Sequence, residues 1–275
     1  MNRRSIALTT VVAFGYALLY VPIVSVVIYS FNDSRLVTLW GGFSLRWYAS
    51  LLQDQQLLEA ALLSLQIAVV SATFATALGA IVALALQRLT RLRGRLLLSG
   101  MVTAPLVMPE IITGLSLLFL FISMAELIGW PLTRGASTIT IAHVTFSMAY
   151  VVVVLRSRLS AMDESLEEAA MDLGGRPVAV FFDITVPMLM PALISGWLLA
   201  FTLSLDDLVI SSFVSGPGAT TLPMFIFAKV RLGVTPDINA ITTIIIVLVA
   251  VAVATAAIVS NRRASASVRR PAPVR

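Results

Sequence analysis

Three carboxylates lie within apolar stretches of this chain. Glu110 follows PLVMP, and Asp206 and Asp207 are adjacent in FTLSLDDLVISSF. A carboxylate at the centre of a bilayer costs about 2.5 to 3.5 kcal/mol on insertion scales, so it persists where water, a partner or a substrate offsets its lost hydration. Acids that face a path through the membrane would favour the passage of a cation. The three residues are therefore candidates for lining a substrate path.

Each of these acids also has a structural interpretation. Glu110 comes directly after Pro109, so it can lie at the N-terminus of a broken helix, where the helix dipole stabilises a negative charge. On a continuous helix Asp206 and Asp207 would point about 100° apart. Both need not face one cavity, and one of them can pair with a hydroxyl group or an arginine. The sequence leaves open which acid faces a path.

Few other residues could perform catalysis or hold a cofactor. The chain has no cysteine and one histidine, His143, so neither thiolate nor multi-histidine metal sites are possible, and we predict no metal site. His143 lies in TIAHVTFSMAY and is expected to form hydrogen bonds between packed helices. A P-loop needs the lysine of Gly-x-x-x-x-Gly-Lys, and the single lysine, Lys229, follows FIFA instead. We therefore expect neither an enzyme nor an ATPase, and no cofactor in this chain.

The composition predicts that a membrane surrounds these residues. Of the 275 residues, 59% are hydrophobic and 12% are charged, whereas an average soluble domain carries about 25% charged residues. Six apolar runs are long enough to cross a hydrocarbon core of about 30 Å as helices. They lie near residues 8–30, 62–87, 101–124, 138–155, 189–211 and 240–260. We predict an all-α membrane protein with one transmembrane domain over residues 1–261 and a basic tail over 262–275.

The basic residues predict the orientation of the spans. The N-terminus, the 88–100 loop, the 156–188 loop and the C-terminal tail hold 14 of the 19 arginines and lysines, and the alternate loops hold 5. Because basic residues are enriched in cytoplasmic loops, both termini are expected in the cytoplasm. The first run lacks a small-residue cleavage site before YSFNDS, so we interpret it as an uncleaved span. The basic residues flank apolar runs, so the net charge of +5 does not indicate nucleic-acid binding.

A polar insert interrupts the apolar pattern between the fourth and fifth runs. It contains EEAAMDLGGRPVAVFFDITVP at residues 167–187. The spacing predicts a helix from about Ala161 to Leu173, with Ser160 as its cap and Asp163 in a capping box. Gly174 fits the left-handed position after a helix end. The insert is therefore predicted to be a helix–turn–helix loop.

The second part of this loop and its surface follow from the same pattern. Pro177 fits the first turn of a second short helix, and Pro187 and Pro191 mark the start of the fifth span. Apolar and acidic residues of the first helix fall on opposite faces. The apolar face holds Met162, Leu166, Ala169, Ala170 and Leu173, and the other face holds Asp163, Glu164, Glu167, Glu168 and Asp172. The apolar face can pack either on the chain's own helices or on a partner.

The loop resembles the EAA motif of the inner-membrane permease subunits of binding-protein-dependent ABC importers, which have the type I importer fold. That motif is E-A-A, three residues, G, nine residues and I-x-L-P. The matching residues are Glu168, Ala169, Ala170, Gly174, Ile184 and Pro187, and Val186 replaces the leucine. The resemblance covers nearly the whole chain. It implies that the loop is a coupling helix that docks on a cytoplasmic ATPase dimer, where ATP and Mg²⁺ bind.

The resemblance extends to a substrate class. TLSLDDLVISSFVSGPGATTLPMFIF and PLVMPEIITGLSLLFLF resemble the spermidine/putrescine importer permeases, and most of all the putrescine-type second permease. This implies a second homologous permease subunit, an extracytoplasmic polyamine-binding protein and a bacterial inner-membrane location. Two alternatives stay open. One is the same importer class with an opine, phosphonate or iron substrate, and the other is an autonomous secondary transporter, which would not explain the polar loop.

Overall fold

The computed structural model describes residues 3–36, 39–89, 93–163, 165–233 and 235–251. Within these ranges the chain is helical, and the only pairing of strand type is an isolated bridge between Asn32 and Phe43. The chain divides into two compact units, one formed by Met1–Gln55 with Ile226–Arg275 and the other by Gln56–Phe225. The predicted tail over 262–275 lies outside the described residues.

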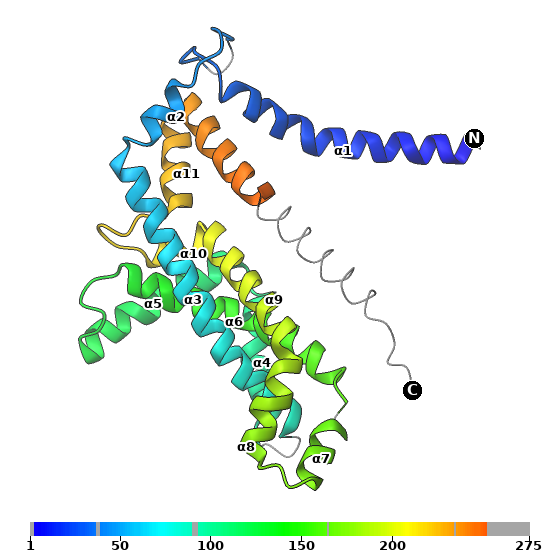
Figure 1. Ribbon diagram of the computed structural model, residues 1–275. Coiled ribbons are helices and arrows are strands. Elements are labelled where there is room, and N and C mark those ends of the chain that lie inside the picture. Colours follow the sequence, from blue (N-terminus) through cyan, green and yellow to red (C-terminus); the bar gives the residue numbers. More distant parts are fainter. Residues whose placement is uncertain (1–2, 37–38, 90–92, 164, 234, 252–275) are drawn as a thin grey trace. The chain divides into compact units, whose positions relative to one another are not determined.

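The 56–225 unit contains the motifs of interest. Its helices are α3 (Gln55–Arg88), α4 (Arg95–Val107), α5 (Glu110–Ile128), α6 (Ala136–Ser160), α7 (Ser165–Asp172), α8 (Pro177–Val180), the π-helical turn η1 (Phe181–Thr185), α9 (Val186–Asp206) and α10 (Val209–Val214). Figure 1 shows α3, α6 and α9 running side by side, with α7 and α8 together at one end of the unit.

The core of this unit is built around α6. One buried cluster joins α6 to α3, α4 and α9, and a second joins it to α3, α5 and α10. The fully buried Val151 of α6 sits against two glycines. A Cβ on Gly79 would lie 2.8 Å from Val151 Cγ1, and one on Gly196 would lie 3.3 Å from it. Small residues at such contacts let membrane helices approach closely, so these glycines set the spacing of α3, α6 and α9.

The predicted spans are confirmed in five cases. Five helical segments are long and apolar enough to cross a membrane: Leu8–Tyr29, Gln55–Arg88, Glu110–Ile128, Ala136–Ser160 and Pro177–Asp206. The described part of the sixth run is a shorter apolar helix, Pro236–Val251. Residues 252–260 of that predicted span lie outside the described residues.

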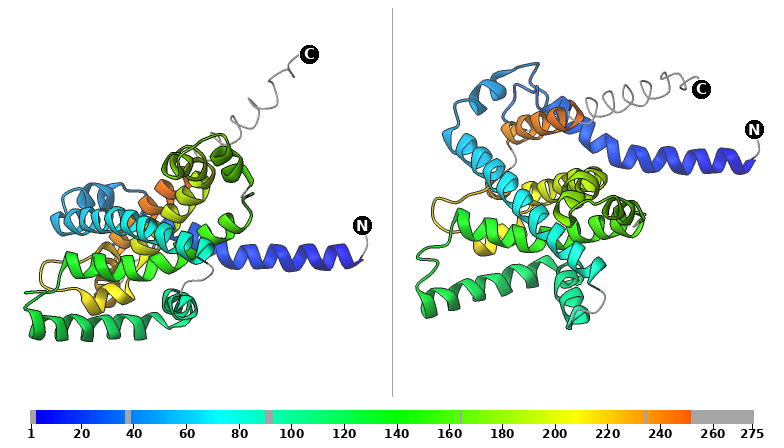
Figure 2. Two further views of the ribbon diagram at one scale, coloured as in Figure 1. Left: turned by 90° about the horizontal axis from the view of Figure 1, so that it is seen from below. Right: turned by 60° about the horizontal axis from the view of Figure 1, so that its bottom comes forward.

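Two of the predicted spans contain a break: the third breaks at Pro109, as the structural interpretation of Glu110 expected, and the fifth, which the helix-wheel argument treated as continuous, breaks at Asp207. Between α4 and α5 the backbone is extended at Met108 and Pro109, and the chain turns there (Figure 2). A proline disfavours helical geometry in the residue before it, which explains the break. The fifth run breaks at Asp207, where ψ is 123°, before α10 begins.

The other unit contains α1 (Arg3–Tyr29), α2 (Arg46–Leu51), the apolar helix Pro236–Val251 and most of α11 (Leu222–Leu232). None of the apolar window of α1 is buried within the chain. The loop after α1 is organised by the buried Asn32, whose Oδ1 accepts from Gly41 N–H at 2.7 Å and whose carbonyl accepts from Trp47 Nε1 at 2.7 Å. α2 thus follows an ordered loop, to which its residue Trp47 is hydrogen-bonded.

Candidate functional site

The turn after α7 has the geometry that the sequence predicted. Gly174 has φ +89°. Its N–H donates to Met171 O at 2.9 Å, and Gly175 N–H donates to Ala170 O at 3.0 Å. This pair of bonds is a Schellman C-cap, which favours glycine at the left-handed position. Pro177 begins α8, as predicted.

The predicted start of the first loop helix is wrong. α6 continues to Ser160, whose Oγ donates to Ser157 O at 3.0 Å, so Ser160 caps nothing. Buried Leu159 holds this last turn of α6 in the core. Asp163 Oδ1 accepts instead from Ser165 N–H at 3.0 Å. Hydrogen bonds from the backbone and side chain of Ser165 lower the pKa of Asp163, so this carboxylate is ionised at neutral pH and suits the start of α7.

The surface of the 156–188 loop is apolar and uncovered within the chain. α7 has no buried residue, and of the predicted apolar face Met162, which precedes α7, is partly buried against the core and Ala170 is half-buried. The exposed large side chains are Leu166, Met171, Leu173, Val178 and Phe182, with Leu173 90% exposed. Of the residues that match the EAA motif, Glu168, Ala169, Gly174 and Pro187 are exposed, and Ala170 and Ile184 are half-buried. Contiguous exposed apolar surface of this kind marks an interaction site.

The second loop helix is not separate from the fifth span. α8, η1 and α9 form one uninterrupted helical run from Pro177 to Asp206. Pro187 lies inside this run, just after the π-helical turn η1, and it lacks the N–H that an interior helical residue donates. α8 is therefore continuous with the fifth span through the π-helical turn η1.

Glu167 makes contacts that the sequence did not reveal. Its Oε1 accepts from a guanidinium nitrogen of Arg88 and from Thr185 Oγ1, the latter at 2.7 Å. The sequence placed Glu167 on the polar face only. A capped acidic helix gives no signal for a partner that is 79 residues away.

Asp207 belongs to a buried polar network at the break between α9 and α10. Its Oδ2 accepts from Ser211 N–H at 2.7 Å and from Ser211 Oγ at 2.8 Å, and its Oδ1 accepts from Ile210 N–H at 3.2 Å. These bonds cap the N-terminus of α10. The Asp207 side chain is 6% exposed. One of the two adjacent acids thus pairs with a hydroxyl group inside the chain, which was one of the two interpretations of the sequence.

His143 connects this network to α6 and α3. Its Nε2 lies 3.1 Å from Asp207 Oδ2 and 3.1 Å from Ser211 Oγ, and its Nδ1 lies 2.6 Å from Ser204 Oγ. Ser71 Oγ donates to the same Ser204 oxygen at 3.0 Å. The expectation that His143 forms hydrogen bonds between packed helices is confirmed.

The other two acids are exposed. Asp206 is the last residue of α9 and Glu110 is the first residue of α5. The position of Glu110 after Pro109, at the N-terminus of a broken helix, agrees with its structural interpretation. The helix-wheel argument for the aspartates is wrong, because the helix ends between them. Asp206 is therefore an exposed residue at the end of α9, whereas the Asp207 side chain is buried.

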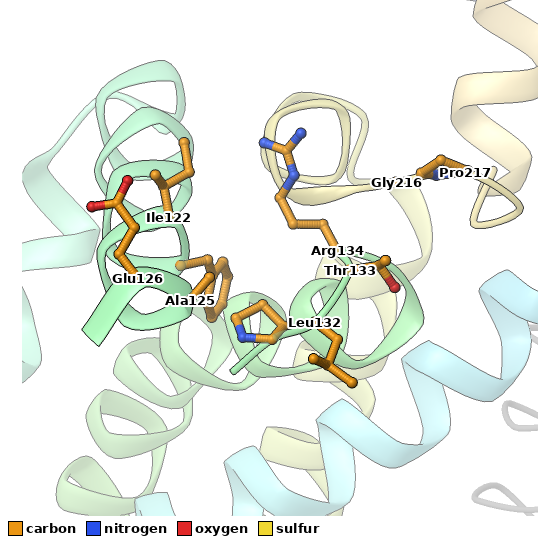
Figure 3. Close-up of a pocket in the computed structure, with 10 residues that line it drawn as sticks. Ile122, Ala125, Glu126, Leu132, Thr133, Arg134, Gly216 and Pro217 are labelled. Atoms are coloured by element: carbon orange, nitrogen blue, oxygen red, sulfur yellow. The ribbon is translucent and has the colours of Figure 1, made fainter. Parts of the chain in front are cut away.

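A cavity of about 550 Å³ lies at the end of α6 that is remote from α7. It is bounded by α5, by the 129–135 loop and by the loop at Gly216 and Pro217. Figure 3 shows Glu126 on its α5 side and Arg134 on its loop side. A Cβ on Gly216 would lie 2.0 Å from Arg134 O, so glycine is needed there for the two loops to meet.

The only lysine lies in an acidic cluster of the other unit. Lys229 Nζ donates to Asp54 Oδ2 at 2.9 Å and to Asp237 Oδ2 at 3.0 Å. Burial opposes the charge on Lys229, but the hydrogen bonds and negative charges of the two aspartates outweigh it and raise the pKa of Lys229. This cluster ties α11 to the residue before α3 and to the start of the last described helix.

Comparison with protein families identifies the family of this chain. The family model described as "Binding-protein-dependent transport system inner membrane component" matches residues 75–270. The chain belongs to this family. It is therefore an ABC transporter permease subunit of the inner membrane, with several membrane-spanning helices, and members of this family do not carry the ATPase activity.

Curated relatives are similar over most of their length. The chain is 60% identical to the putrescine transport system permease protein PotI of Escherichia coli strain K12, over 86% of this chain and 84% of that protein. It is 44% identical to the spermidine/putrescine transport system permease protein PotC of the same strain, over 85% and 86%. The match with PotI covers the loop, the break in the fifth span and most of the helices.

Solved structures support the fold. A bacterial ABC transporter involved in import of the acidic polysaccharide alginate matches with a TM-score of 0.69 and 17% identity, over 95% of this chain and 98% of that chain. A bacterial alginate ABC transporter in complex with an alginate pentasaccharide-bound periplasmic protein matches with a TM-score of 0.70 and 15% identity, over 94% and 93%. At such identities the likeness shows the fold alone.

Proposed function

We propose that this chain is the permease subunit of an ATP-driven polyamine importer and that putrescine is its principal substrate. The 60% identity with the PotI permease carries this proposal. An exposed carboxylate at the end of the fifth span suits a cationic substrate, since putrescine carries two positive charges at neutral pH.

The 156–188 loop is proposed as the docking element for the ATPase. Its exposed apolar side chains and the exposed Glu168 and Ala169 form a surface that a cleft in the ATPase can cover. The Schellman turn at Gly174 sets the direction of the chain between α7 and α8. ATP and Mg²⁺ would bind to the partner ATPase dimer, and closure of that dimer would move α8 and the fifth span together.

The proposed topology has six spans, with both termini and the 156–188 loop in the cytoplasm. The division of basic residues, 14 against 5, supports it. The 550 Å³ cavity then lies on the outer side, at the opposite end of α6 from the loop. A polyamine-binding protein would approach from that side. A second homologous permease would complete the path, and the surrounding lipid would cover the remaining apolar surface.

Impermeant maleimide labelling tests the topology, because the chain has no cysteine of its own. Single cysteines at the exposed Ser165 and the half-buried Ser215 are expected to react from opposite sides of the membrane. Labelling of both from one side would contradict the six-span arrangement.

Among the acids, Asp206 is the proposed path residue. It is exposed at the end of α9, whereas Asp207 is already hydrogen-bonded to the backbone, a hydroxyl group and a histidine. Glu110 is a weaker candidate, because its place at the start of α5 is explained by the helix N-terminus alone.

Reconstitution with the partner subunits tests the proposal. The chain, its sister permease and the ATPase should purify as one complex. In proteoliposomes, the ATPase rate should rise when the polyamine-binding protein is added with putrescine. Stimulation by an opine, a phosphonate or iron but not by polyamines would overturn the substrate assignment and keep the importer class. Transport without any ATPase would overturn both.

A further inference from the structure

In the described part of the chain, Glu167 is the residue of α7 whose side chain bonds to other helices. No residue of α7 is buried, yet the Glu167 side chain is only 16% exposed. That side chain contacts the last residue of α3, Arg88, and the last residue of η1, Thr185. One acid thus joins the loop helix to the ends of two different spans.

The two partners of Glu167 differ in burial. Thr185 is fully buried and its hydroxyl group donates to the carboxylate, whereas the Arg88 side chain is 41% exposed. A bond between a carboxylate and a guanidinium group is charge-assisted and stronger than a neutral one. Removing the carboxylate would leave the buried hydroxyl group of Thr185 without this acceptor, which is unfavourable. Both the bond with Arg88 and the bond with Thr185 therefore require the carboxylate of Glu167.

The position of Thr185 adds a second, independent observation. It closes η1, a five-residue π-helical segment between α8 and α9. π-Helical turns inside α-helices are rare and occur frequently at functional sites. Here the irregular turn lies where the loop joins the fifth span, directly beside Glu167.

The geometry points to Glu167, with Arg88 and Thr185, as the joint that transmits movement of α7 to the second and fifth spans together. This inference rests on the coupling role proposed for the loop. Glu167 is a positioning residue: it does not match the EAA motif, and its carboxylate is turned toward its own chain rather than toward a partner. Without the joint, α7 could still dock on the ATPase, but its displacement would reach α3 weakly.

The test uses the complete transporter in proteoliposomes, with putrescine uptake and ATP hydrolysis measured on the same samples. The variants are Arg88→Glu, Glu167→Arg and the double exchange of the two charges. A partly exposed ion pair contributes at most about 1 kcal/mol, which corresponds to about fivefold in an equilibrium. Each single variant is therefore expected to lower the putrescine transported per ATP hydrolysed by about fivefold. The double exchange should restore part of the ratio, because it re-forms the ion pair but leaves the Thr185 hydroxyl group without its carboxylate acceptor. Arg93→Glu reverses an exposed arginine beyond the end of α3 and should leave the ratio unchanged.

Two milder variants keep the test informative if a charge reversal misfolds the protein. Glu167→Gln keeps an oxygen acceptor for Thr185 and removes the charge, and Thr185→Val removes the hydroxyl group. Both should lower the ratio less than the charge reversals while ATPase association stays normal. An unchanged ratio in all single variants, or a double exchange that restores nothing, would overturn the joint. Uptake by the wild-type complex is measured before any variant is compared. If that complex moves no putrescine, the proposed function fails, not the joint.

Discussion

Two pairs of neighbouring acids can be compared directly: Glu167 with Glu168 on α7, and Asp206 with Asp207 at the end of α9. In each pair one carboxylate is bonded inside the chain and the other is exposed. The bonded member of the first pair binds a partly exposed arginine and a fully buried threonine. The bonded member of the second pair caps a helix in the core and holds a buried histidine. The two adjacent acids of each pair thus have different structural environments.

The difference between the two pairs lies in burial. Asp207 cannot exchange its partners for water, because its side chain is 6% exposed. Arg88, the partner of Glu167, is 41% exposed, so water can replace much of that contact. Loss of a bond costs most where the group left behind is buried. We therefore expect stability to depend most on Asp207, and transport to depend on Glu167 and on the exposed Asp206.

The largest effect is expected for Asp207→Ala. The substitution removes the acceptor of two N–H groups in the first turn of α10 and the partner of His143 together, at a cost of roughly 2–4 kcal/mol. The melting temperature of the detergent-purified complex should fall clearly. Asp206→Ala is the matched control and should melt like the wild type. Equal destabilisation by the two substitutions would remove the distinction between the aspartates.

The next effect is expected for Gly174→Asp, which tests the loop side of the comparison. Left-handed backbone costs a residue with a Cβ roughly 1–2 kcal/mol, or about 5- to 30-fold in the population of the native turn. The protein should reach the membrane, while ATPase association and uptake fall. Gly174→Asn is the matched control, because asparagine tolerates this conformation better. Normal uptake by Gly174→Asp at normal abundance would refute the role of the turn.

A smaller effect is expected for Asp206→Asn. This substitution keeps the shape of an exposed side chain and removes only its charge, so assembly and melting temperature should not change. Putrescine uptake should fall at low substrate concentration, because the negative charge no longer favours the cation. Wild-type uptake at matched membrane levels would make Asp206 structural and leave the polyamine assignment to similarity alone.

The smallest effect is expected for Lys229→Met, in the cluster where two acids share one cation. Partly exposed ion pairs contribute about 0–1 kcal/mol each, so the melting temperature should fall slightly. Because the pKa of Lys229 is raised, its contribution is full below the unfolded value of about 10.4 and is lost only at higher pH. The contribution of Lys229 to stability should therefore not change with pH between about pH 6 and 8. A large pH dependence in that range that this substitution abolishes would contradict the pairing.

Much of the fold could be predicted from the sequence, because hydrophobic runs and turn residues act locally. The apolar runs located the spans, and Gly174 and Pro177 located the loop turn through their backbone preferences. Pro109 carried a local signal for the break before α5. These features depend on residues that are close in the sequence, so one sequence is enough to recognise them.

What could not be predicted depends on tertiary contacts. The break at Asp207 has no proline or glycine in LDDLVI, and it is held partly by His143 on another helix. The extension of α6 past its predicted end follows from the burial of Leu159 in the core. The contact between Glu167 and Arg88 joins residues that only the folded chain brings together. Sequence spacing therefore found the candidate acids but not which of them is engaged.

Accumulation of radiolabelled putrescine tests the central claim most directly. Proteoliposomes would contain this chain, its sister permease and the ATPase, with the polyamine-binding protein outside and ATP inside. We predict accumulation that requires ATP, that unlabelled putrescine and spermidine reduce by competition, and that is lost when the ATPase is omitted. Accumulation that continues without ATP or ATPase, or no accumulation by an assembled complex that hydrolyses ATP, would contradict the assignment of this chain as a polyamine importer permease.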